Sequence, residues 1–138
     1  MAPALPDSDI DLYMGIGGST EAVLAAAGIK CLGGDMQCKM WPRDDKERKK
    51  LIEEGCEQDL DRVFTADDLA RGKNIIFCAT GISDSALLRG VKTKGGATAL
   101  THSILMRANT GTVRFIRAEH NLHTKTIRLR SDNREHRI

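Results

Sequence analysis

The order of apolar and polar residues predicts an α/β first part followed by an antiparallel β part. Residues 10–14 place apolar side chains at alternate positions, which is typical of a strand. The alanine-rich residues 19–29 favour a helix with Gly18 or Ser19 as its N-cap, and Gly33-Gly34 is expected to end it. Further strands are expected at 35–41, 61–64, 74–81, 91–94, 97–107, 112–119 and 124–130, and further helices at 44–54, 65–70 and 83–89.

Residues 74–81 form a continuous apolar run, which predicts a buried parallel strand. Asn109-Thr110-Gly111 is expected to be a hairpin turn between two later strands. The resulting organisation is a loop or truncated end at 1–8, one domain at 9–130 and a polar tail at 131–138.

Composition narrows the class of protein. The 138 residues are enough for one domain with its own core, and 41% of them are apolar but only 4% aromatic, so an aliphatic core is expected. No run approaches the ~20 apolar residues of a membrane span, and the first residues lack the features of a signal peptide. Four cysteines without a Cys-x-x-Cys pair are expected to be reduced. These features predict a cytoplasmic protein.

The net charge of +2 is unevenly distributed. From Arg107 onward there are eight Lys and Arg against three Asp and Glu, whereas the preceding residues have thirteen against sixteen. A basic tail can bind nucleic acid, but these arginines partly alternate with apolar residues, as on the exposed face of a sheet. Neither a nucleic acid nor a membrane is therefore expected as a partner.

The turn Gly15-Ile16-Gly17-Gly18 is the main candidate site. Its glycines allow backbone N–H groups to approach a ligand, and the helix that follows directs the positive end of its dipole at the turn, which favours phosphate. Glu21, in the first helical turn, would repel a bare phosphate unless a divalent cation lay between them. A tight structural turn and a dipole-stabilised glutamate are the alternatives. The turn matches neither the full dinucleotide fingerprint nor a P-loop.

Two weaker constellations could also carry chemistry. The strand at 74–81 ends in a polar stretch whose Thr80, Ser83 and Asp84 could line a ligand site, although N-capping of a short helix by Ser83 is the favoured interpretation. His120 and His123 lack further partners for a metal site, and His102 is expected to be structural.

Longer stretches of the sequence resemble the bacterial class II fructose-1,6-bisphosphatases. The similar stretches run in order along the chain, at 11–24, 30–37, 74–82, 87–91 and 112–120. They cover nearly all of this chain but only the C-terminal two-fifths or so of a family member.

The resemblance implies a metal-dependent hydrolase that removes the 1-phosphate of fructose 1,6-bisphosphate, some members also accepting sedoheptulose 1,7-bisphosphate. It implies an α/β, layered sugar-phosphatase-like fold, of which this chain would be the C-terminal portion, with a mixed sheet, flanking helices and antiparallel C-terminal strands. Glu21 would be a ligand of Mn²⁺ or Mg²⁺, and Gly18 would contact the sugar bisphosphate substrate. No catalytic residue is identified in this chain by the resemblance.

The sequence departs from the family pattern in two ways. Thr20 stands where the family turn usually has a proline, and the family's other acidic metal ligands, which lie in its N-terminal half, have no counterpart here. Because hard cations take about six oxygen ligands, we expect the isolated chain to bind metal weakly and to be inactive. The expected partners are the N-terminal half or a second copy of the chain. A non-catalytic binding or oligomerisation module and a nucleotide-binding half-domain are the alternative functions.

Overall fold

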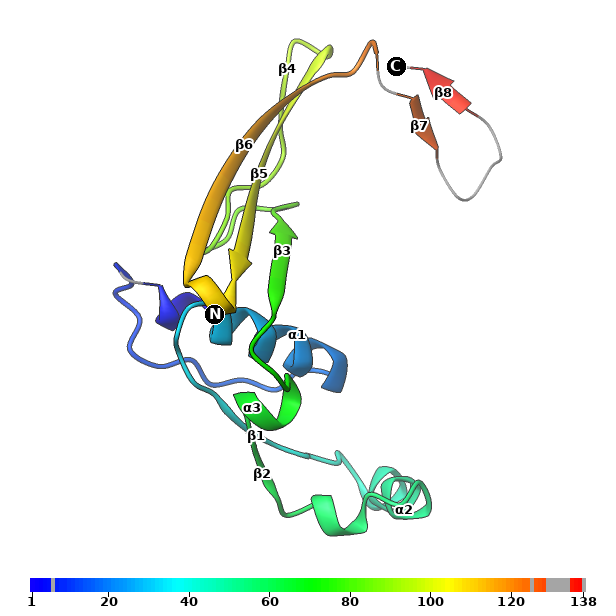
Figure 1. Cartoon of the computed structure of the whole chain (residues 1–138). Coiled ribbons are helices and arrows are strands. Elements are labelled where there is room, and N and C mark those ends of the chain that lie inside the picture. Colours follow the sequence, from blue (N-terminus) through cyan, green and yellow to red (C-terminus); the bar gives the residue numbers. More distant parts are fainter. Residues whose placement is uncertain (6, 125, 129–134, 138) are drawn as a thin grey trace.

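A computed structural model describes residues 1–5, 7–124, 126–128 and 135–137 (Figure 1). The helices are α1 (Ser19–Cys31), α2 (Asp45–Glu53) and α3 (Ala66–Leu69), with 3₁₀ turns η1 (Ala2–Ala4), η2 (Glu57–Asp59) and η3 (Ala108–Thr110). The strands are β1 (Gln37–Lys39), β2 (Val63–Thr65), β3 (Ile76–Thr80), β4 (Lys92–Lys94), β5 (Thr98–Arg107), β6 (Thr112–Asn121), β7 (Thr126–Arg128) and β8 (Glu135–Arg137). Most expected elements are therefore confirmed, and so is the α/β class.

The C-terminal predictions can be compared with the structure only in part. Residues 125, 129 and 130 of the expected last strand, and 131–134 and 138 of the expected polar tail, lie outside the described residues, whereas 135–137 form β8, which pairs with β7. The boundaries of the domain and its layering stay predictions.

Helix α1 forms as the sequence predicts and ends in a glycine motif. Its N-cap is Gly18, one of the two expected residues. At its end, Gly33 takes a positive φ of 73°, and its N–H bonds to the carbonyl of Lys30 at 3.2 Å. The N–H of Gly34 reaches back to Ile29 O at 3.1 Å. These two bonds are the Schellman arrangement, which satisfies carbonyls that the helix leaves free.

A four-stranded antiparallel sheet holds the core. Strands β3 and β4 pair with successive parts of one edge of β5, and β6 pairs along its other edge. Ile104 and Met106 of β5 are fully buried and form the core cluster with Cys31 of α1 and Leu88. Figure 1 shows α1 and α3 between this sheet and the small β1–β2 pair.

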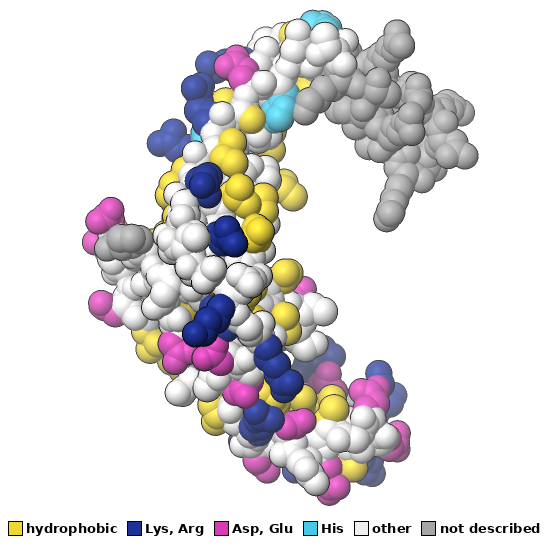
Figure 2. Space-filling model, in the orientation of Figure 1, with side chains coloured by type: hydrophobic (Ala, Val, Ile, Leu, Met, Phe, Trp, Pro, Cys, Tyr) yellow, Lys and Arg dark blue, Asp and Glu magenta, His cyan; other side chains and the backbone are white. Residues whose placement is uncertain are grey.

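The strand at 74–81 differs from its prediction. It is shorter, it pairs antiparallel with β5, and its side chains alternate between half-buried and exposed. Phe77 and Ala79 pack on the core, whereas Ile76 and Cys78 lie exposed on the opposite face. A run that is apolar on both faces indicates two-sided burial, but within the described residues only one face is covered. In Figure 2, hydrophobic side chains accordingly show at the surface over the sheet region.

The strand predicted at residues 10–14 is absent. Residues 11–20 are all exposed and form no strand. A strand needs a neighbour for its backbone groups, and no described residue supplies one.

Two further expectations were wrong in detail. Residues 83–89 form a loop rather than a short helix, because Asp84 Oδ1 accepts a hydrogen bond from Gly90 N–H at 2.9 Å and so closes the segment on itself. Gly90 also lies so close to Ser83 that a β-carbon on it would meet backbone atoms. Within the expected loop at 1–8, residues 2–4 form η1, and Met1 packs against the core.

The charged middle of the chain folds as its capping residues predict. Asp44 caps α2 by accepting a hydrogen bond from Glu47 N–H at 2.7 Å. Thr65 and Asp68 form a reciprocal capping box on α3. The strand expected at 35–41 is limited to β1, which pairs antiparallel with β2. None of the helices in the described part of the chain has both the length and the apolar character that a membrane span requires.

Candidate active-site turn

The glycine turn lies directly at the N-terminus of α1, as the sequence predicts. Gly18 is the N-cap and has no side chain with which to cap the helix. Backbone N–H groups at such a helix end can bind an anion, which the helix dipole also favours.

Glu21 folds back over this helix end. Its carboxylate accepts a hydrogen bond from its own backbone N–H and one from Thr20 Oγ1 at 2.9 Å. The backbone bond, and then the Thr20 bond, hold the pKa of Glu21 below its ordinary value. The carboxylate is thus ionised at neutral pH, which is the form that binds a metal ion.

Gly18 and Glu21, three positions apart in the sequence, meet in space. A β-carbon built on Gly18 would contact Glu21 Oε2. The two positions that the family resemblance assigns to substrate and metal therefore form one local unit. Any larger residue at Gly18 would push the carboxylate away from the helix end.

The turn is open on the surface of the described chain. Residues 11–20 are exposed, and two pockets elsewhere on the described chain, one beside Lys30 and one along α2, do not include the turn. The described residues also contain no group of three or more His, Cys, Asp or Glu side chains that could hold a metal ion. Glu21 has the right donor chemistry for Mn²⁺ or Mg²⁺ but supplies one ligand of about six.

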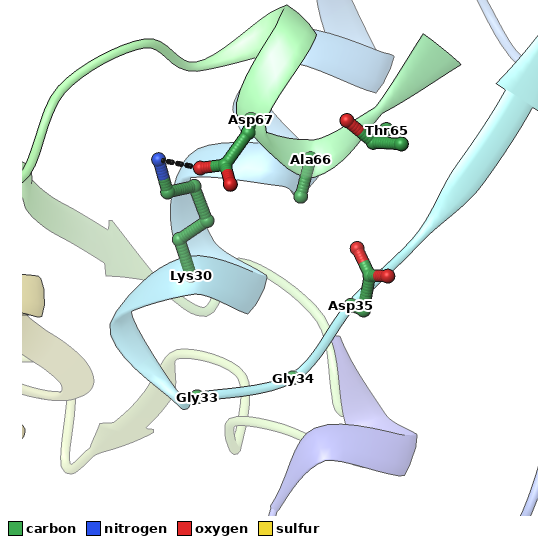
Figure 3. A pocket seen from close by; sticks show the side chains of 7 residues that line it. All are labelled: Lys30, Gly33, Gly34, Asp35, Thr65, Ala66 and Asp67. Atoms are coloured by element: carbon green, nitrogen blue, oxygen red, sulfur yellow. Dashed lines mark ion pairs between the residues drawn. The ribbon is translucent and has the colours of Figure 1, made fainter. Parts of the chain in front are cut away.

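One of the pockets, of about 380 Å³, lies at the other end of α1, between that helix and α3 (Figure 3). Lys30 enters it from α1 and forms an ion pair with Asp67 at 2.5 Å. The same Nζ donates hydrogen bonds to the carbonyls of Ala70 at 2.8 Å and Gly72 at 3.0 Å. All three donors of the ammonium group are occupied, so Lys30 fastens α3 to α1 and leaves no donor for a ligand. This role is not predicted from the sequence, because a lysine in the last turn of a helix indicates contacts with the terminal carbonyls of that same helix.

Replacing Lys30 by methionine should lower the free energy of unfolding by about 1–3 kcal/mol, because it leaves two carbonyls without their charged donor. The side chain is only 17% exposed, so water replaces the donor poorly. Urea unfolding followed by circular dichroism measures the change, with the exposed Lys46→Met on α2 as the matched control. Equal midpoints for the two variants would contradict the fastening role.

Side chains of the weaker candidate sites make hydrogen bonds or ion pairs within the described chain. Thr80 Oγ1 lies 2.8 Å from Ser103 Oγ, and Asp84 binds Lys92 Nζ at 2.7 Å. His120 Nε2 lies 2.8 Å from Thr101 Oγ1. Thr80 and Asp84 therefore have partners within the described chain.

The chain is similar to known proteins over most of its length. Residues 1–120 match the family model described as bacterial fructose-1,6-bisphosphatase, glpX-encoded. The chain is 40% identical over 129 residues to the class 2 fructose-1,6-bisphosphatase of Haemophilus influenzae, a match covering 86% of this chain and 38% of the relative. It is 36% identical over 132 residues to fructose-1,6-bisphosphatase 1 class 2 of Escherichia coli K12, covering 88% of this chain and 39% of that protein.

The fold and the turn define an α/β protein with a glycine turn at a helix N-terminus and an adjacent carboxylate. The match extends over most of the chain, and the chain belongs to the glpX-encoded bacterial fructose-1,6-bisphosphatase family. It spans about two-fifths of the length of the curated relatives it matches, of which 38% and 39% are covered.

Proposed function

We propose that this chain supplies one wall of the active site of a metal-dependent sugar bisphosphatase. The observation that carries the proposal is the Glu21 carboxylate lying against Gly18 at the N-terminus of α1. The names of the relatives make fructose 1,6-bisphosphate the first substrate to test.

In the proposed reaction, water attacks the phosphorus of the 1-phosphate and the P–O bond to the sugar breaks. The products are inorganic phosphate and fructose 6-phosphate, whose C1 oxygen takes up a proton. Bound Mn²⁺ or Mg²⁺ would neutralise phosphate charge and lower the pKa of a bound water.

The residues of this chain would orient and bind. Gly18 allows the phosphate to approach the N–H groups at the start of α1, and the Glu21 carboxylate turns away from its own backbone N–H to hold the cation beside the phosphate. Because one carboxylate cannot complete the coordination shell, the remaining acidic ligands come from polypeptide corresponding to the part of the relatives outside the match. The proposed setting is bacterial carbohydrate metabolism.

The test compares the isolated 138-residue chain with a chimaera. In the chimaera, the full-length Haemophilus influenzae relative carries this chain in place of its matching segment. Phosphate release from fructose 1,6-bisphosphate is measured with and without Mn²⁺. We expect release from the chimaera only, and only with the cation.

Two results would overturn the proposal. Cation-dependent release by the isolated chain would show that its site is already complete. A folded chimaera that releases no phosphate, whereas the parent relative does, would favour a non-catalytic role for this chain.

A further inference from the structure

The segment that leads into the active-site turn carries an unburied apolar strip, defined here as Leu12, Tyr13, Met14 and Ile16. Their exposed fractions lie between 72% and 83%. Figure 1 draws this segment as a coil that runs from η1 to α1. Four large apolar side chains in five consecutive positions are not the isolated exposed residues that are normal on a protein surface.

The backbone of this segment is also unpaired. Residues 11–17 make no backbone–backbone hydrogen bond with any described residue. The same residues alternate apolar positions as a strand does. A segment with the pattern of a strand, exposed side chains and free backbone groups is suited to join the edge of another sheet.

The exposed area of the chain as a whole, of which the strip is a small part, indicates how much surface is left uncovered. The whole chain exposes 10714 Å², whereas a compact monomer of the same mass exposes about 7,000 Å². The excess, roughly 3,500 Å², is several times the ~800 Å² that each partner contributes to a standard interface. A second copy docking through one such contact would leave most of the excess exposed. A large covering polypeptide accounts for it better.

The matched relatives contain such a polypeptide, because 62% of the Haemophilus influenzae protein lies outside the 38% that the match covers. The strip ends two residues before Gly18, so whatever covers the strip also adjoins Glu21. The same docking contact can therefore bury the strip and complete the coordination shell of the metal ion.

We propose that residues 10–16 add as a strand to a sheet of the polypeptide corresponding to the unmatched part of the relatives, and that this addition holds Glu21 against the remaining metal ligands. The positioning of Glu21 rests on the proposed function, whereas the strand addition does not depend on it. It applies whether that polypeptide is joined to this chain or supplied separately.

The test measures docking without using activity. The tagged 138-residue chain is co-expressed with the unmatched part of the Haemophilus influenzae relative, and the pair is purified on the tag. Amide hydrogen exchange then follows residues 11–17 in the isolated chain, in the pair and in the chimaera. We expect fast exchange in the isolated chain and protection in the other two. The chimaera keeps the test decisive if the separate polypeptide is insoluble.

Variants distinguish backbone pairing at the strip from non-specific hydrophobic binding. Leu12→Pro removes a backbone donor from the strip, and Met14→Asp places a charge on it. Each should reduce recovery of the partner at least about tenfold, which corresponds to one tenfold step in affinity. Ile82→Asp is the matched control, because Ile82 is 87% exposed but lies on the loop after β3. It should leave recovery unchanged.

Three outcomes would overturn the inference. The amides of residues 11–17 could exchange as fast in the chimaera as in the isolated chain. The strip variants could bind as well as the Ile82 control. The isolated chain could instead form a dimer that the strip variants abolish, which would make a second copy the occupant. Protection of residues 11–17 in a chimaera that releases no phosphate would support the docking and reject only the proposed activity.

Discussion

Replacing Glu21 by glutamine lowers cation-dependent phosphate release from fructose 1,6-bisphosphate at least about 100-fold in the chimaera. Loss of an outer-shell partner of a metal site typically costs ~10–100-fold, and loss of a direct ligand should cost no less. Glutamine keeps the size of the side chain but loses the negative charge that a hard cation prefers. The initial rate at saturating substrate, measured over a series of Mn²⁺ concentrations, gives the result. The concentration needed for half of the maximal rate should rise together with the fall in rate.

The fold of the chain should be unaffected by this change, because Glu21 is exposed and its hydrogen bonds are with its own backbone and with Thr20. Glu53→Gln on α2 removes a second exposed glutamate and is the control for charge alone. It should retain full activity. If Glu21→Gln stays within twofold of the unmodified chimaera while circular dichroism shows both folded, Glu21 is not a metal ligand.

The elements most readily predicted from the sequence are those with local causes. Thr65 and Asp68 cap α3 through bonds within four residues, and Gly33 ends α1 because it takes a positive φ. The Gly18–Glu21 unit was also predictable, because a helix brings positions three apart onto one face. Its exact contact, with the carboxylate folded over the bare N-cap, required coordinates.

The wrong predictions concern segments whose structure depends on contacts with residues far away in the sequence. The pattern of residues 10–14 is that of a strand, but a strand forms only with a neighbour. The apolar run at 74–81 indicated burial on both faces, yet Ile76 is 68% exposed. The Lys30 contacts with α3 join residues about forty apart in the sequence, which no local pattern encodes. The segments at 10–14 and 74–81 both carry apolar surface that the described chain does not cover. This shared exposure supports the docking inferred above.

Replacing Met106 by alanine should lower the free energy of unfolding of the isolated chain by about 2–5 kcal/mol, as large-to-small changes in a core do. Met106 is fully buried and packs in the cluster with Cys31, Leu88 and Ile104. Ile104 and Met106 are the largest fully buried side chains that the structure describes. Whole domains are stable by only about 5–15 kcal/mol, so a loss of this size should unfold a large part of the population. Urea unfolding measured by circular dichroism tests it.

Met14→Ala provides the matched control, because it makes the same chemical change at a side chain that is 83% exposed. In the isolated chain it should change the free energy of unfolding by no more than about 0.5 kcal/mol. In the chimaera the same variant should become destabilising, because the strip is then buried against the added polypeptide, whereas Met106→Ala should be costly in both. Equal losses from the two variants in the isolated chain would contradict the described core. A Met14→Ala variant that costs nothing in the chimaera would show that the strip stays exposed there, and so would contradict its addition to a sheet.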